Sequence, residues 1–115
     1  MIKNQNQSTE NIIKELFLQE LNQRTNTIKK LRSAQLCKED IEKLSFAFLI
    51  FVLELYAREN ISQRTAVNYM TMVDELKDYP SFPLVNLISI FNENMDNVSL
   101  DTFTRVCNAL SNIHV

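Results

Sequence analysis

The chain of 115 residues contains no glycine at all and only two prolines. Because glycine provides the left-handed conformations of sharp turns, the chain has few residues that suit such turns. A glycine-rich phosphate loop is excluded for the same reason, since the backbone of such a loop must approach the phosphate closely. The two prolines, Pro80 and Pro83, lie close together and are expected to interrupt helical structure at one place.

Histidine and cysteine are nearly absent as well. His114 is the one histidine, next to the last residue, and no nucleophile lies near it in the sequence. Cys37 and Cys107 lack the spacing of a disulfide framework or a metal site, which predicts a reducing, cytoplasmic environment. Cys107 falls on an apolar stripe and is expected to pack in the core, whereas Cys37 occupies a helix N-cap position, where a thiolate is stabilised. We therefore predict no catalytic residue, no metal and no cofactor.

The charge and hydropathy of the chain are those of an ordinary globular protein. The net charge is −2, and 45% of the residues are hydrophobic against 23% charged. This composition gives no overall attraction to nucleic acid or to an anionic membrane. Residues 1–8 are polar and lack the apolar core of a signal peptide. We expect a flexible tail there and a single helical domain over residues 9–115.

The longest apolar run covers residues 46–53 and continues beyond Glu54 through residues 55–57. The run is shorter than the ~18 to 20 apolar residues that a membrane-spanning helix needs. We expect it to form the middle of one helix, over about residues 38–59, that is apolar on most sides. The sequence leaves open whether the surface of residues 46–57 is core or an exposed interface, including one that forms a homodimer.

Apolar residues elsewhere recur at helical spacing, and no segment alternates with a period of two for long enough to predict a strand. The predicted fold class is all-α: a single-domain bundle of about five helices around the central apolar helix. The expected helices cover residues 10–33, 38–59, 63–78, 83–91 and 99–112, with a loop at residues 92–97. The inward stripe of the 63–78 helix is expected to contain Ala66, Tyr69, Met70, Val73 and Leu76.

Several residues are typical of helix ends. Ser62 and Ser99 are expected to be N-caps, because a serine side chain can accept a hydrogen bond from a free amide of the first turn. Val98 and Phe103 have the spacing of a hydrophobic staple around Ser99. Asn60 is expected to take the left-handed conformation that ends the central helix, a role that glycine usually has.

Two acidic features of the sequence are candidate sites. The loop at residues 92–97 resembles the start of an EF-hand, but it has Asn97 where glycine is needed and Phe103 where the bidentate glutamate belongs. Glu54 is the one carboxylate isolated in an apolar segment. Burial there would raise its pKa, although a polar position on the helix surface or an interface ion pair is the simpler interpretation.

Residues 60–70 resemble the turn and recognition helix of helix-turn-helix proteins. The segment is also similar to the opening helix of the core-binding domain of tyrosine recombinases. The resemblance covers eleven residues and implies that Gln63, Arg64 and Asn68 reach the edges of DNA bases. It predicts, as an alternative function, a DNA-binding transcriptional regulator that uses the 63–78 helix.

The function that the sequence favours is a small protein-binding module without catalysis. Such a protein acts by occluding a surface, as an inhibitor, an immunity or antitoxin-type protein, or an anti-activator. Acidic residues gather in the second half of the chain, where they would repel DNA phosphates and attract a basic partner such as a nuclease, a toxin or a DNA-binding activator. The predicted partner-binding residues are Asp74, Glu75, Asp78, Glu93 and Asp96.

Overall fold

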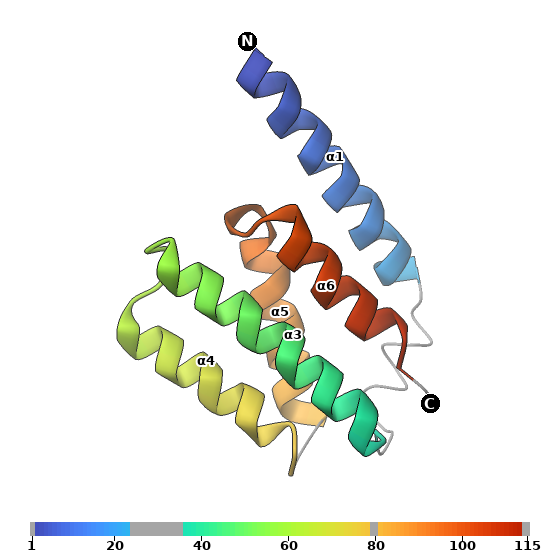
Figure 1. The fold of residues 1–115 in the computed structure, drawn as a ribbon. Coiled ribbons are helices and arrows are strands. Elements are labelled where there is room, and N and C mark those ends of the chain that lie inside the picture. The colour runs from blue at the N-terminus through green and yellow to red at the C-terminus, as the bar shows by residue number, and fades with distance from the viewer. Residues whose placement is uncertain (1, 24–35, 79–80, 114–115) are drawn as a thin grey trace.

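The computed structural model describes residues 2–23, 36–78 and 81–113 (Figure 1). These residues form five α-helices and one turn of 3₁₀-helix, and they contain no strand, which confirms the predicted all-α bundle. The elements are α1 (Ile2–Gln23), α3 (Lys38–Ala57), α4 (Gln63–Glu75), α5 (Ser81–Asn94), η1 (Met95–Asn97) and α6 (Leu100–Ser111).

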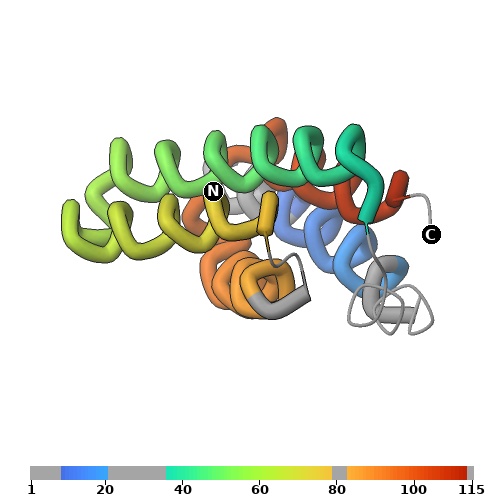
Figure 2. Tube along the Cα trace, turned by 90° about the horizontal axis from the view of Figure 1, so that it is seen from below, coloured from blue at the N-terminus to red at the C-terminus, as the bar shows by residue number. Residues whose placement is uncertain are grey.

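The bundle is arranged around α3. Helices α4 and α6 lie on either side of α3 and run antiparallel to it (Figure 1). Seen from below, these three helices form one layer, and α5 packs beneath them with α1 alongside α6 (Figure 2). The side of α3 that faces away from α5 is therefore covered by no other helix of the described part of the chain.

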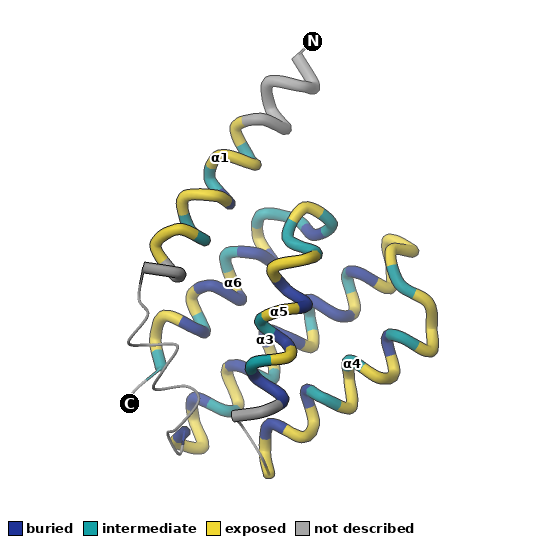
Figure 3. Tube along the Cα trace, turned by 180° about the vertical axis from the view of Figure 1, so that it is seen from behind, coloured by how far each residue is buried: buried dark blue, intermediate teal, exposed yellow. Residues whose placement is uncertain are grey.

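The core is built around a column of phenylalanine rings. Phe51 of α3 meets Phe91 of α5 with ring centroids 5.4 Å apart, and Phe91 stacks on Phe103 of α6 at 5.1 Å. The column continues to Phe48 of α3 at one end and to Phe17 of α1 at the other. Figure 3 shows buried positions gathered where α3, α5 and α6 face one another, while α1 and α4 carry exposed positions along their outer sides.

A buried lysine attaches α1 to the rest of the bundle. Lys14 is only 2% exposed, and its Nζ donates hydrogen bonds of 2.8 Å to the carbonyl oxygens of Met95 and Val98. The ammonium group also lies 5.9 Å from the centroid of the Phe103 ring and 3.6 Å from a carboxylate oxygen of Glu10. These contacts satisfy a charge that would be costly to bury alone. They fix α1 against the turn that precedes α6.

The helix caps agree with the sequence except at the end of α3. The hydroxyl of Ser62 accepts a hydrogen bond from the Thr65 amide, and the hydroxyl of Ser99 accepts one from the Thr102 amide, as predicted. The left-handed residue after α3, however, is Glu59 with φ of 60°, not Asn60. The amide of Asn60 donates to the carbonyl of Leu55, five residues back, and this bond requires the turn to fall on the residue before Asn60.

Other helix boundaries differ from the sequence pattern. Helix α1 begins at Ile2, so it includes residues 2–8, for which a tail was expected. Residues 92–94 form the last turn of α5 and residues 95–97 a 3₁₀ turn, where a loop was expected. The Asn94 side-chain amide donates to the Ile90 carbonyl in α5, and the Asn97 side-chain amide donates to the Asn94 side-chain oxygen, which supports both turns. Residues 24–33 of the expected first helix lie outside the described residues.

We expect Glu59→Gly to stabilise the protein by about 1 kcal/mol, because a non-glycine residue in the left-handed region crowds its own Cβ. The free energy of unfolding, measured by urea denaturation, tests this. Asn60→Gly is the control. Asn60 does not have a positive φ, so glycine brings no gain there, and the variant should lose stability because its unfolded chain is more flexible. A destabilised Glu59→Gly variant would contradict the assignment of the turn.

Substitutions at Phe51 and Leu49 compare the buried and the exposed side of the apolar run. Phe51 is fully buried, so Phe51→Ala should cost about 3 to 5 kcal/mol of unfolding free energy. Leu49 is exposed on the opposite side, and Leu49→Ala should cost less than about 1 kcal/mol in the monomer. Thermal or urea unfolding at low protein concentration measures both. Equal losses would show that the two sides are buried alike.

Candidate functional site

The most prominent surface feature is an apolar face on the outside of α3 and α4. We call it the outer apolar face. Its six side chains are between 37% and 54% exposed. Apolar residues scattered singly over a surface are normal, but six that adjoin one another need an explanation. The outer apolar face consists of Phe46, Leu49, Leu53 and Tyr56 on α3 and Val67 and Met70 on α4.

The face exists because α3 is apolar on two opposite sides. Successive residues of an α-helix are rotated by about 100°, so Leu44, Phe48 and Leu55 share the side that is turned to α5 and is fully buried. The same rotation places Leu49 and Leu53 on the opposite side. Helices α4 and α6 flank α3 and leave that side uncovered (Figures 1 and 2). The 46–57 run is therefore partly core and partly exposed surface.

Helix α4 extends the face. Its buried residues Ala66 and Val73 point to the core, and the rotation of about 100° per residue places the exposed Val67 and Met70 on the side of α4 that adjoins the outer side of α3. Met70, which the periodicity assigned to the inward stripe, is 37% exposed. The assignment was wrong because α4 lies at the edge of the layer and buries only a narrow strip of its surface.

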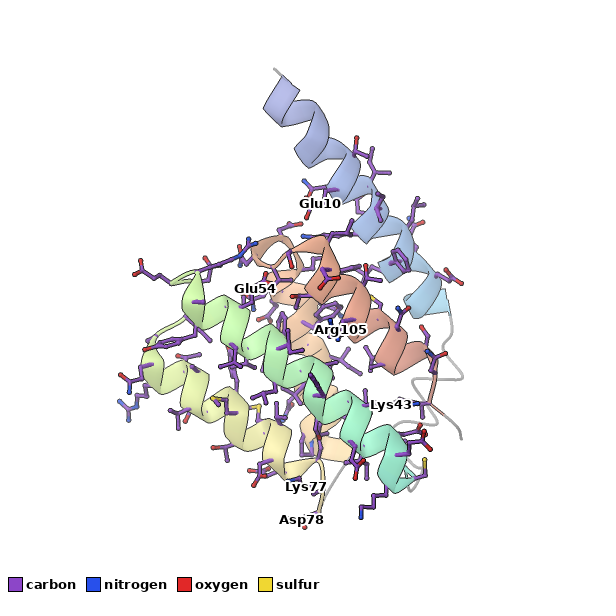
Figure 4. All side chains as sticks on the ribbon, in the orientation of Figure 1. Glu10, Lys43, Glu54, Lys77, Asp78 and Arg105 are labelled. Atoms are coloured by element: carbon purple, nitrogen blue, oxygen red, sulfur yellow. The ribbon has the colours of Figure 1, made fainter. Side chains whose placement is uncertain are left out.

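Charged residues distinguish the two ends of the outer apolar face. At the end formed by the start of α3 and the end of α4, which we call the acidic end, five exposed carboxylates stand with three lysines. The other end, which we call the arginine end, has two arginines and two glutamates, because Glu54 lies 3.3 Å from Arg58 in an ion pair. Lys77 and Asp78 lie at the acidic end (Figure 4). The acidic end comprises Glu39, Glu42, Asp74, Glu75, Asp78, Lys38, Lys43 and Lys77, and the arginine end Glu54, Arg58, Glu59 and Arg64.

The predicted partner-binding carboxylates fall into two groups. Asp74, Glu75 and Asp78 are exposed together at the acidic end. Glu93 and Asp96 lie near the other end of the bundle, since η1 is tied to the α3–α4 turn by a hydrogen bond from the Asn60 side chain to the Asn97 carbonyl. The structure thus brings three of the five residues together and separates them from the remaining two.

The residues proposed for DNA contact are all exposed on α4. Gln63, Arg64 and Asn68 occupy its first turns, and Arg64 and Asn68 share one side of the helix. In helix-turn-helix proteins the second helix crosses the first at about 90 to 120° and projects from it. Here α4 lies beside α3 in an antiparallel pair (Figure 1).

Phe46 marks the border of the outer apolar face towards α6. Its ring lies 5.9 Å from the guanidinium carbon of Arg105, which Figure 4 shows on α6 beside α3. A shallow groove between the two helices passes Phe46, Ala47, Arg105 and Ala109. The groove continues the apolar surface with polar groups at its rim, an arrangement that is typical of the edge of a protein interface.

Glu54 has a structural role that the sequence did not reveal. Figure 4 shows it between α3 and the start of α6. Its carboxylate accepts hydrogen bonds from the Ser99 amide, from the Ser99 hydroxyl at 2.9 Å and from the Thr102 hydroxyl at 2.7 Å. Arg58 lies 3.3 Å from the same carboxylate. Glu54 thereby caps α6 from another helix, and its negative charge suits the positive end of the α6 dipole.

The pKa of Glu54 is lowered from its ordinary value, contrary to the expectation from burial alone. Partial burial is the largest single influence and raises the pKa. The hydrogen bonds from Thr102 and Ser99, together with the charge of Arg58, favour the ionised form and outweigh burial in sum. A carboxylate held ionised by its partners is a cap and not a general acid.

The two cysteines lie in different surroundings. Cys107 is buried and free, as predicted, and burial raises the pKa of its thiol to about 12. Cys37 is free and exposed at the N-cap of α3, and its side chain makes no capping hydrogen bond. His114 lies outside the described residues. Among the residues that the structure does describe, no three histidine, cysteine or acidic side chains are grouped as metal ligands.

We expect Glu54→Gln to lower the free energy of unfolding by about 1 to 2 kcal/mol at neutral pH, since the charged acceptor is lost. Because the folded pKa lies below the unfolded one, this contribution is present above the unfolded pKa, near 4.5, and disappears as the pH falls through the folded value. Urea unfolding of both proteins between about pH 7 and pH 3 measures the difference. Glu42→Gln, exposed on the same helix, is the control, and a difference that does not change with pH would refute the assigned role.

Comparison of the chain with protein families, with curated proteins and with solved structures found no match. None of the described helices has both the length and the apolar character needed to cross a membrane. The outer apolar face and the charges at its ends are accordingly the features from which a function can be inferred.

Proposed function

We propose that the protein is a small protein-binding module that acts by covering a surface of its partner, with the outer apolar face as its binding surface. An inhibitor, an immunity or antitoxin-type protein, or an anti-activator works in this way. The two free cysteines suit a reducing cytoplasm as the place of action.

The size and composition of the outer apolar face carry this proposal. Six large side chains, each about half exposed, present on the order of 500 Å² of apolar surface. That amount matches the apolar share of one side of a standard interface, which buries about 800 Å² per partner. Phenylalanine, tyrosine and methionine, which are enriched in interfaces, supply three of the six side chains.

The charges around the face support a role in selecting the partner. Asp74, Glu75 and Asp78 are exposed beside Met70 at the acidic end, where they would attract a basic surface and repel an acidic one. Charges at the rim of an interface act mainly on the rate of association. The apolar side chains are thus expected to determine the lifetime of the complex and the carboxylates its orientation.

The test is a quantitative affinity capture from the source cell with three proteins: wild type, Leu53→Asp and Leu16→Asp. Leu53 lies in the middle of the outer apolar face, whereas Leu16 on α1 is equally apolar and 59% exposed. We expect Leu53→Asp to capture at least tenfold less of a protein that wild type and Leu16→Asp both capture, because a carboxylate buried in an interface is strongly unfavourable. Circular dichroism checks that both variants remain helical.

Two results would contradict the proposed function. In the first, Leu53→Asp and wild type capture the same proteins in the same amounts. In the second, purified wild-type protein forms a sequence-specific duplex complex tighter than about 10⁻⁸ M that Arg64→Ala weakens. The second result would instead support the alternative DNA-binding regulator that uses Gln63, Arg64 and Asn68.

A further inference from the structure

The outer residues of α3 have the spacing of a coiled-coil seam. Phe46, Leu49, Leu53 and Tyr56 follow one another at intervals of three, four and three residues. This is the alternation of a and d positions in a heptad, by which one helix packs its side chains between those of another. Glu42 continues the same spacing towards the N-terminus and is exposed. A straight helix is therefore a geometrically suitable occupant of this stripe.

Helix α4 carries its charges against its own dipole. Arg64 lies in its first turn and Asp74 and Glu75 lie in its last, whereas the dipole favours acids at the start and bases at the end. Local helix stability does not account for this order. The same order lets Arg64 at the arginine end of one molecule face the carboxylates at the acidic end of another.

This polarity distinguishes two ways of stacking the faces of two identical molecules. A two-fold axis that lies parallel to the helices would place acidic end on acidic end. A two-fold axis across the helices places α3 on a second α3 and α4 on a second α4, each pair antiparallel, with every acidic end on an arginine end. Charge complementarity selects the second arrangement.

The register of that arrangement follows from the midpoint of the α3 seam, halfway between Leu49 and Leu53. Around this midpoint Leu49 meets Leu53 of the other molecule, and Phe46 meets Tyr56. The midpoint lies at residue 51, before Asn60 in the α3–α4 turn, and Tyr69 lies equally many residues after Asn60. Because α3 and α4 are antiparallel, Tyr69 is therefore level with the midpoint. Position 64 of α4 then lies opposite position 74 of the second copy, so that Arg64 of one molecule joins the Asp74–Lys77 ion pair of the other.

We propose that the outer apolar face binds a second copy of this chain and forms an antiparallel, two-fold symmetric dimer through α3 and α4. This inference rests on the proposed function, since it names the partner of the same surface. The dimer covers the six apolar side chains of each copy and pairs the charges at both ends.

Sedimentation equilibrium on the full-length protein tests the dimer. At about 100 μM, where a complex of micromolar dissociation constant is almost fully formed, wild type should sediment at twice the chain mass of 13.4 kDa. Leu53→Asp should sediment as a monomer with an unchanged circular dichroism spectrum, and Leu16→Asp, altered on α1, should remain a dimer. Wild type that is monomeric at this concentration, or a Leu53→Asp variant that stays dimeric, would overturn the proposal.

Disulfide cross-linking tests the orientation. Leu49→Cys and Leu53→Cys are made separately, each with Cys37→Ser to remove the exposed native thiol. In the antiparallel dimer the two copies of position 49 are offset by about 6 Å along the helix, too far for a disulfide across the interface, whereas positions 49 and 53 face each other. Oxidation of the mixture should therefore give a covalent dimer in at least fivefold excess over either variant alone. Efficient cross-linking of each variant alone would overturn the antiparallel arrangement.

The outcomes separate the dimer from the proposed function. If wild type is monomeric but Leu53→Asp still loses a captured partner, the dimer is refuted and the protein-binding function stands. If wild type is monomeric and Leu53→Asp loses nothing, both are refuted. Dimeric wild type with heterotypic cross-links supports the dimer, and a captured protein other than this chain that Leu53→Asp loses supports the protein-binding function.

Discussion

The column of phenylalanine rings through the centre of the bundle determines how the other elements are placed. Phe51, Phe91 and Phe103 join α3, α5 and α6, and Phe17 adds α1 at the end of the column. Each ring buries a large apolar area, and the edge and stacked contacts restrict how the helices can rotate about their own axes. Once Phe51 points to Phe91, the rotation of α3 is fixed, and Leu49 and Leu53 must point away from the core.

Two polar groups complete the assembly at the turn before α6. Glu54 of α3 accepts hydrogen bonds at the start of α6, and Lys14 of α1 donates to the carbonyls of Met95 and Val98 in the same turn. Both side chains satisfy backbone or capping groups that would otherwise be buried without a partner. The turn is therefore fixed from two sides, and with it the position of α6 relative to both α1 and α3.

The outer apolar face is a consequence of making one helix apolar on two sides. The inner side of α3 meets α5, and no described helix is left to cover the outer side. Leu53 and Tyr56 remain exposed there with Val67 beside them. Exposed apolar surface of this extent favours association, and its cost in solubility is offset by the charges at its two ends. The proposed function and the proposed dimer both follow from this division of α3.

Local sequence signals predicted the features that depend on near neighbours. The helical periods, the serine caps at Ser62 and Ser99 and the burial of Cys107 involve residues within one or two turns of each other, so the chain determines them before any tertiary contact forms. The all-α class follows from these signals. So does the existence of a helix over 38–57 whose surface is apolar nearly all round, although its inner and outer sides are alike in sequence.

Contacts between distant residues decided the rest. Glu54 has its lowered pKa because Ser99 and Thr102, some 45 and 48 residues away, donate to it, and no local pattern contains that partnership. The exposure of Met70 depends on α4 lying at the edge of a layer. The sequence by itself determined that α3 carries more apolar surface than one side of a helix can bury; only the tertiary structure decided which side is left exposed, because the rings around Phe51 and Phe91 choose the rotation of the helix.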